Sequence, residues 1–375
     1  MTRQSVLVLN AGSSSLKFRV VDPRDGSVRA GGLLERVDET GTEAALQHLT
    51  ESLERADVTA SSLLAVGHRV VHGGACFTAP TIVDDDVLVE IEDLSRLAPL
   101  HNPPAALGIR HARERFPELP QVAVFDTAWF VDLPAAAATY AIDADLATRE
   151  GIRRFGMHGT SHEYVATEAA AFLGRAPADV DLVTLHLGNG ASATAVGRGR
   201  PVDTSMGFTP LEGLVMGTRP GDLDLGVLIH LMRHARMDAD DLEDLLHHRS
   251  GLQGLSGLHD FRDLVDAIDS GHERARTAYD VYCHRIRKYV GAYLAVLGGA
   301  DAIVFTAGVG ENVPRLRADV LSGLTALGID VDPKRNLDHS DSARRISTDA
   351  SRVAVLVVPT HEELAIARHV ADLLR

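Results

Sequence analysis

Short apolar runs that end in glycine-rich polar turns recur along this chain. Residues 6–20, VLVLNAGSSSLKFRV, form an apolar run that enters a turn of asparagine, glycine and three serines before a second apolar run begins. Residues 181–196, DLVTLHLGNGASATAV, repeat that plan, and residues 304–312, VFTAGVGEN, end a third run in a similar turn. Glycine lets the backbone approach an anion, and N–H groups and hydroxyls donate to it. The pattern predicts phosphate-holding hairpins and an internal duplication.

Between these turns, apolar runs alternate with amphipathic stretches. Uninterrupted apolar runs predict buried strands at 121–125, 182–187, 302–306 and 353–358. Apolar residues at helical spacing predict helices over 103–116, 275–297 and the last residues from 362 onward. A further helix is expected up to Gly174, where Thr160 and Glu163 have the spacing of a capping box. Strands that alternate with helices indicate an α/β fold.

Composition narrows the class of protein. A chain of 375 residues is long enough for two domains. Its net charge of −15 argues against a nucleic-acid partner, because contacts with phosphates dominate that kind of binding. The N-terminal segment has no signal-peptide pattern, and no apolar stretch is long enough to span a bilayer. Two cysteines without metal or disulfide spacing fit a reducing compartment, so we expect a cytoplasmic protein without a membrane partner.

Charged and imidazole side chains stand at strand ends and in glycine turns. Arg69 lies in GHRVVHGG, Asp126 follows the strand at 121–125, His158 lies in FGMHGTSH, and Arg219 lies in MGTRPGD. Each also has a structural interpretation, since Arg69 could pair with a carboxylate, Asp126 could cap a helix and His158 could donate within a turn. As a set they suit phosphoryl transfer, which needs planar arginines, a further donor and a carboxylate for a metal.

Ten motifs in order now point to a family. They are NAGSSSLKF, GHRVVHGG, LAPLHNPP, VFDTA, FGMHGTSH, HLGNGAS, DTSMGFTPLEG, MGTRPGD, FTAGVGEN and PTHEELAIA. Over essentially its whole length the chain resembles the acetokinase family. The resemblance implies a two-lobed, duplicated actin-like ATPase fold of the ribonuclease-H type, with a mixed five-stranded sheet and helices in each lobe and ATP between the lobes. It also implies a homodimer that transfers a phosphoryl group reversibly between ATP and acetate with Mg²⁺ or, as an alternative, Mn²⁺.

The resemblance further assigns domains and residues by motif position. Residues 1–128 with 363–375 would form the first lobe, and residues 129–362 the second, which would carry the dimer contacts. Asn10 and Glu362 would hold the metal, and Arg69, Asp126, His158 and Arg219 would be catalytic. The acid would be bound by Arg69, Val71, Leu100, His101, Met157 and Pro210. ATP or ADP would be bound by Ser13, Lys17, His186, Leu187, Gly188, Asn189, Gly190, Asp260, Phe261, Arg262, Gly308, Val309, Gly310, Glu311 and Asn312.

Asp126 has two possible roles by this resemblance, as an acid–base group or as an orienting carboxylate. A carboxylic acid substrate is already ionised near neutral pH, so its activation needs no strong base. We therefore expect Asp126 to act electrostatically, by fixing Arg69 or the metal.

Four departures from the family pattern concern the surroundings of these residues. Met157 replaces a phenylalanine, His361 an asparagine before the metal glutamate, Leu225 a proline and Phe130 a histidine. Because methionine is flexible, Met157 leaves open a kinase for a longer acid such as propionate or butyrate. A nucleotide-dependent binding protein without transfer is a second alternative. A sugar kinase is disfavoured, because paired arginines suit a carboxylate better than a hydroxyl.

Overall fold

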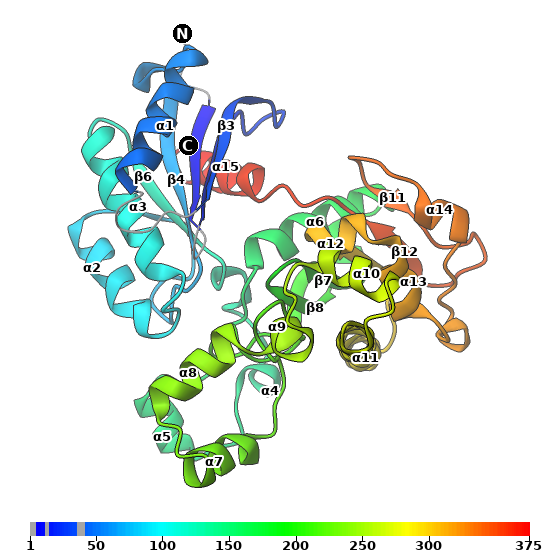
Figure 1. The fold of residues 1–375 in the computed structure, drawn as a ribbon. Coiled ribbons are helices and arrows are strands. Elements are labelled where there is room, and N and C mark those ends of the chain that lie inside the picture. The colour runs from blue at the N-terminus through cyan, green and yellow to red at the C-terminus, as the bar shows by residue number, and fades with distance from the viewer. Residues whose placement is uncertain (1–4, 12–14, 36–41) are drawn as a thin grey trace. The chain divides into compact units, whose positions relative to one another are not determined.

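The computed structural model describes residues 5–11, 15–35 and 42–375 (Figure 1). The chain divides into two compact units. The first takes the described residues up to Val131 together with Met157–Tyr164 and His361–Arg375, and the second takes Asp132–Gly156 and Val165–Thr360. The assignment of domains with boundaries at residues 128 and 362 stays a prediction.

The first unit is built on a mixed sheet in the order β3-β2-β1-β4-β6-β5. β1 pairs antiparallel with β2, which pairs antiparallel with β3, whereas β1, β4 and β6 run parallel. The strands are β1 Ser5–Ala11, β2 Ser15–Val21, β3 Val28–Glu35, β4 Leu63–Val70, β5 Thr81–Ile82 and β6 Gln121–Phe125. The helices are α1 Thr42–Arg55, α2 Asp85–Asp93, α3 Asn102–Arg115 and α15 Glu362–Leu373.

The second unit repeats this topology. Its sheet has the order β11-β12-β10-β7-β8-β9, with an antiparallel hairpin β7–β8, an antiparallel β9 and parallel β7, β10 and β12. The strands are β7 Asp181–Leu187, β8 Ala191–Gly197, β9 Arg200–Thr204, β10 Ala302–Thr306, β11 Arg344–Arg345 and β12 Ala354–Val357. The same strand order and directions in both units agree with the internal duplication expected from the hairpin motifs.

Helices of the second unit follow and flank this sheet. The longest is α11, Glu273–Leu297, as the apolar spacing predicted. The others are α4 Ala135–Ala138, α5 Ala144–Arg149, α7 Leu225–His234, α8 Ala239–His248, α9 Gly251–Ser256, α10 Phe261–Asp269, α12 Ala307–Asn312, α13 Pro314–Leu321 and α14 Pro333–Leu337. α6, Gly159–Phe172, begins in the first unit and continues into the second. In the described part of the chain, no helix combines the length and apolarity that a bilayer span requires.

The α/β fold with two mixed sheets is confirmed, but each sheet has six strands where the resemblance implied five. The additional strands, β5 and β11, have two residues each and pair at a sheet edge. A strand of two residues leaves no periodic signal in the sequence.

The first sheet is covered on both faces. On one face, Ile366, Ala367 and Val370 of α15 pack against Val6 and Val8 of β1. Figure 1 shows α15, in red, alongside the blue strands of this unit. On the other face, Phe18 packs with buried side chains of α1 and α3. This double coverage makes β1, β4 and β6 almost wholly apolar and leaves polar residues to their ends.

Candidate active site

Arg69 and Asp126 form a buried ion pair where two parallel strands of the first unit end. Arg69 is the last but one residue of β4, and Asp126 directly follows β6. Arg69 Nη2 lies 2.6 Å from Asp126 Oδ2, and Nε donates to both carboxylate oxygens at 3.1 and 3.2 Å. Asp126 is fully buried. A two-point pair of this kind fixes the plane and direction of the guanidinium.

Asn10 and Glu362 complete this group of side chains. Arg69 Nη1 donates to Asn10 Oδ1 at 3.2 Å and lies 3.6 Å from Glu362 Oε2. Asn10 Nδ2 donates to the same Glu362 oxygen at 3.1 Å. Asn10 is the last but one residue of β1, next to β4 in the sheet, and Glu362 opens α15. We call Asn10, Arg69, Asp126, Glu362 and Thr160, whose Oγ1 donates to Asp126 Oδ1 at 3.1 Å, the Arg69 cluster.

In this ion pair, the effect of the charges on each pKa is opposite to the effect of burial. Burial alone would lower the pKa of Arg69, but the charges of Asp126 and Glu362 raise it above its ordinary value. Burial raises the pKa of Asp126, and Arg69 offsets part of that effect. Arg69 therefore stays positive, and the cluster holds a cation in a fixed orientation.

The turn at 156–159 carries His158 to the end of β6. Gly159 N donates to the Asp126 backbone oxygen at 3.0 Å, and a Cβ at Gly159 would collide with that oxygen. His158 has φ +59°, a left-handed conformation that costs free energy for a residue with a Cβ. Its carbonyl accepts from Ser161 and His162 in the first turn of α6. The glycines on each side thus allow a strained histidine beside Asp126.

This turn corrects the expected capping box. α6 begins at Gly159, so Thr160 lies within its first turn instead of preceding the helix, and its hydroxyl binds Asp126. Glu163 binds His369 of α15 at 3.1 Å. The polar residues of this segment serve tertiary contacts, which spacing along the sequence does not reveal.

The phosphate residues expected in the first hairpin are only partly described. Ser13 lies outside the described residues. Lys17 Nζ lies 2.7 Å from Glu363 Oε1, next to the predicted metal ligand Glu362. Its role toward phosphate stays a prediction.

The residues expected around the acid lie in both units. Val71 and Met157 are buried in the first unit, where Leu100 and His101 are half-buried. Pro210 is buried in the second unit. Their shared role as a substrate pocket stays a prediction.

Arg219 of the second unit contrasts with Arg69. Its side chain is buried, and Nη1 donates to the Pro210 carbonyl at 2.8 Å. Burial lowers the pKa of Arg219 to about 10. Among the described residues no carboxylate lies at ion-pair distance from it. A buried cation without a counter-charge is a strong receptor for an anion.

A cavity of about 690 Å³ in the second unit brings together most of the predicted nucleotide residues. Those that line it are Gly188, Asn189, Asp260, Phe261, Arg262, Gly308, Val309 and Asn312. Gly217 also lines it, and a Cβ there would collide with Asn189 Oδ1. Gly217 lies two residues before Arg219 in the sequence, so the Arg219 loop borders this cavity.

The other predicted nucleotide residues are placed differently. His186 and Leu187 end β7, and Gly190 O accepts from Gly188 N at 3.0 Å in the tight turn that follows. Glu311 Oε1 accepts from the backbone N–H groups of Ala307 and Thr360, and Gly310 is buried in α12. None of these five lines the cavity, and their binding roles stay predictions.

Sequence reasoning missed several residues that the structure brings to these sites. Thr160 and Gly217 were inside quoted motifs, so their motif membership was the available signal. Leu252, His259 and Val313 also line the cavity, but they stand outside the quoted motifs, and only the packing of α9, α10 and α12 places them there.

Met157, the first of the four departures, is buried, and the other three have identifiable surroundings. The His361 ring meets Tyr164 edge-on at 5.7 Å, just before Glu362. Phe130 is fully buried and meets the ring of His162 at 6.2 Å. Asp224 Oδ1 accepts from Gly226 N at 2.8 Å and caps α7, so Leu225 starts a helix where the family has proline.

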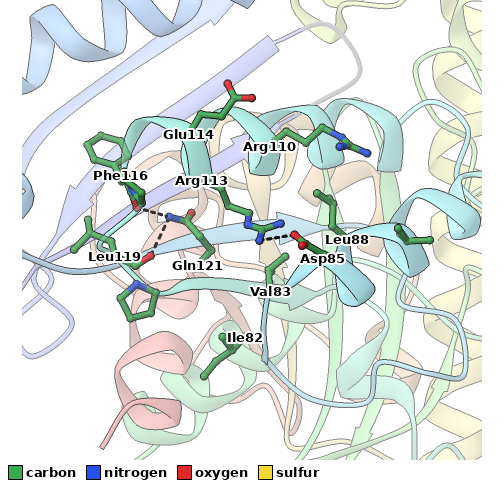
Figure 2. A pocket seen from close by; sticks show the side chains of 13 residues that line it. Ile82, Val83, Asp85, Leu88, Arg110, Arg113, Glu114, Phe116, Leu119 and Gln121 are labelled. Atoms are coloured by element: carbon green, nitrogen blue, oxygen red, sulfur yellow. Dashed lines mark hydrogen bonds and ion pairs between the residues drawn. The ribbon is translucent and has the colours of Figure 1, made fainter.

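A second hollow, of about 610 Å³, lies on the first unit over β5, α2 and α3 (Figure 2). None of the predicted site residues lines it. Its two arginines have partners, since Arg113 pairs with Asp85 at 2.7 Å and Arg110 with Glu92 at 2.5 Å. The hollow therefore offers no unpaired cation to an anion.

Comparison with known proteins agrees with the ordered motifs. The sequence profile of the acetokinase family matches residues 5–368. The chain is 38% identical to Porphyromonas gingivalis acetate kinase, with a TM-score of 0.91 and coverage of 99% of this chain and 100% of that one. It is 36% identical to a propionate kinase from Francisella tularensis, with a TM-score of 0.89 and 98% of each chain covered. For Entamoeba histolytica acetate kinase the identity is 29% and the TM-score 0.87, over 98% of this chain and 99% of that chain. The chain therefore belongs to the acetokinase family, a family of kinases.

Proposed function

We propose that this kinase transfers the γ-phosphoryl group of ATP reversibly to the carboxylate of acetate, giving acetyl phosphate and ADP in one in-line step. The observation that carries the proposal is Arg219, a buried cation without a carboxylate partner in the described chain, on a loop that borders the nucleotide cavity. A transferring phosphoryl group supplies the negative charge that this arginine lacks.

Arg69 and Asp126 have complementary parts in this reaction. Arg69 attracts an anionic acid, and Asp126 fixes its guanidinium through two hydrogen bonds. Acetate is already ionised at neutral pH, so Asp126 has no proton to remove. Positioning two anions beside fixed cations lowers their repulsion, which is the main barrier to this transfer.

His158 and Lys17 would add to this charge stabilisation. His158 lies in the turn hydrogen-bonded to the end of β6, and we propose that it donates to the oxygens of the transferring group. Lys17 is held by Glu363 and would interact with the nucleotide phosphates.

The donor set in the first unit fits a hard cation. Glu362 offers a carboxylate and Asn10 an amide oxygen, and Mg²⁺ is often held by one or two such groups together with substrate phosphates. When bound, Mg²⁺ or Mn²⁺ would neutralise charge on those phosphates. Asn10 orients Glu362 through the hydrogen bond at 3.1 Å and so prepares the carboxylate for the ion.

Propionate is the second candidate acceptor. Met157 is buried and flexible, so it can move to admit one more methylene. The similarity to a propionate kinase supports the same alternative.

We also propose that the chain acts as a homodimer in the cytoplasm. α7 has no buried residue, and Leu225, Ile229 and Met232 on it are more than half exposed. A helix so apolar normally packs against another surface. Light scattering should therefore give twice the chain mass, and Ile229→Asp should reduce it to one chain.

Hydroxylamine trapping of acyl phosphate tests the reaction. Purified protein with ATP and Mg²⁺ is assayed with acetate, propionate, butyrate and glycerate, and Arg219→Ala serves as the inactive control. Turnover highest with acetate supports the proposal, and turnover highest with a longer acid changes only the acceptor. ATP binding without hydroxamate from any acid would reject transfer and favour a nucleotide-dependent binding protein.

A further inference from the structure

Among the described residues Arg219 has no carboxylate partner, although the segment 210–222 that contains it carries two carboxylates. Glu212 and Asp222 stand seven residues before and three residues after it in the sequence. A buried arginine ordinarily pairs with a carboxylate that can reach it, because an uncompensated buried charge is costly. Both carboxylates are instead bound by other side chains.

Asp222 is held by two residues of α11. Tyr289 donates its hydroxyl to both Asp222 carboxylate oxygens at 3.0 Å. Arg285 Nη1 lies 3.6 Å from Asp222 Oδ2, and Nη2 donates to the Asp222 carbonyl at 3.1 Å. Gly213 N donates to Asp222 Oδ1 at 3.0 Å, and Arg285 Nη1 donates to the Gly213 carbonyl at 2.8 Å. Arg285 and Tyr289 thus close the neck of the loop formed by residues 213–222.

Glu212 is bound in a similar way, by an arginine and a tyrosine that precede it in the sequence. Arg154 Nη2 donates to Glu212 Oε1 at 2.6 Å, and Tyr140 donates its hydroxyl to Glu212 Oε2. Arg154 Nη1 also donates to the carbonyls of residues 204, 205 and 206. The segment that presents Arg219 therefore has both of its neighbouring carboxylates neutralised.

We propose that Arg285 is a positioning residue that keeps Arg219 available for a substrate anion. It holds the Asp222 carboxylate at the loop neck, away from Arg219, and it fixes the backbone at Gly213 and Asp222. Without Arg285, the negative charge of Asp222 loses its counter-ion and is attracted to Arg219. The identity of the anion in this inference rests on the proposed function. The statement that Arg285 prevents Arg219 from pairing with Asp222 does not.

The test compares Arg285→Met, Asp222→Asn and the double variant. Arg285→Met should lower kcat/KM by about a hundredfold, the scale of a displaced catalytic group. The double variant should recover most of that loss, because it removes the carboxylate that competes for Arg219. Arg285→Lys should retain much of the activity. Arg287→Met is the matched control on the same helix, because the hydrogen bonds that Arg287 donates in the described part of the chain go to the backbone carbonyls of residues 319 and 320.

A second measurement does not depend on turnover. Phenylglyoxal modification of Arg219, followed by mass spectrometry of its peptide, should be slower in Arg285→Met than in the wild type and fast again in the double variant. If Arg285→Met does not fold, Tyr289→Phe weakens the same hold on Asp222 and should shift both measurements in the same direction. Equal losses in the single and double variants, or no effect of Arg285→Met, would overturn the inference. If the modification rates differ as expected but the wild type makes no acyl phosphate, only the proposed function is rejected.

Discussion

Arg69 and Arg219 are both buried, but they stand in opposite electrostatic settings. Carboxylates raise the pKa of Arg69, whereas burial lowers the pKa of Arg219 to about 10. Arg69 has two carboxylates and an amide around it. Within the described chain, the side chain of Arg219 makes one hydrogen bond, to the Pro210 carbonyl. Arg69 is therefore already compensated and oriented, whereas Arg219 gains most from an incoming anion.

This difference predicts opposite effects on stability when either arginine is removed. A compensated cation supports the fold through its partners, and an uncompensated one is retained at a cost to the fold.

Arg219→Ala should give the largest effect on activity. Loss of an arginine that stabilises the transferring phosphoryl group costs about 10³-fold or more in rate. The free energy of unfolding should stay the same or rise, because the variant removes an unpaired buried charge. Coupled assay of ADP formation and urea denaturation measure the two effects. Arg262→Ala is not a suitable control because Arg262 lines the nucleotide cavity, so Arg345→Ala on the short strand β11 is used instead. Near-normal turnover of Arg219→Ala would remove the main support for the proposed function.

Arg69→Met should change the stability of the fold in the opposite direction from Arg219→Ala. It leaves Asp126 and Glu362 without their cation, which should lower the free energy of unfolding by about 3–5 kcal/mol. Adding Asp126→Asn should restore part of that stability without restoring activity. Urea denaturation of the wild type, Arg69→Met and the double variant measures this. An unchanged stability of Arg69→Met would mean that the Arg69 cluster is not an energetic unit.

The Arg69 cluster could be predicted from the sequence to a large extent. Asn10 and Arg69 are the last but one residues of β1 and β4, and Asp126 directly follows β6. These strands are parallel neighbours, and the ends of parallel strands meet at one sheet edge. Motif position then added Glu362, which starts the helix that packs on β1. A strand-end pattern therefore carries the geometry of this group in the sequence itself.

The surroundings of Arg219 could not be predicted in this way. Its setting depends on Arg285 and Tyr289, which lie more than sixty residues away on α11, and on Arg154 from the segment before α6. These contacts arise from side-chain packing between helix and loop, and no local period records them. For the same reason, Thr160 was expected in a helix cap and instead binds Asp126.

A smaller effect, on the pH dependence of stability, is expected from His68, which precedes Arg69 on β4. It is buried, and its Nε2 lies 2.8 Å from Gln121 Oε1. Burial lowers its pKa to about 4, so the unfolded chain binds a proton between pH 6.5 and 4 that the folded chain does not. The free energy of unfolding should therefore decrease as the pH is lowered from 6.5 to 4, by roughly 3 kcal/mol at pH 4.

Urea denaturation at pH 7, 6, 5 and 4.5 measures this loss. His68→Gln should flatten the pH dependence, while His339→Gln, at an exposed position after α14, should leave it unchanged. An identical pH dependence in wild type and His68→Gln would show that other groups cause the acid sensitivity. The result also separates acid effects on this strand from any titration of Asp126.

The smallest predicted effect probes the cavity beside Arg219. A Cβ at Gly217 would collide with Asn189 Oδ1, so Gly217→Ala must displace a side chain that lines the cavity. The KM for ATP should rise about tenfold, equivalent to about 1.4 kcal/mol, with a smaller change in kcat. Gly291→Ala in α11, where an added Cβ meets nothing within 4 Å, is the control. An effect on kcat alone would mean that Gly217 acts through the position of Arg219 and not through the nucleotide cavity. The loop that carries both residues would then serve to place Arg219.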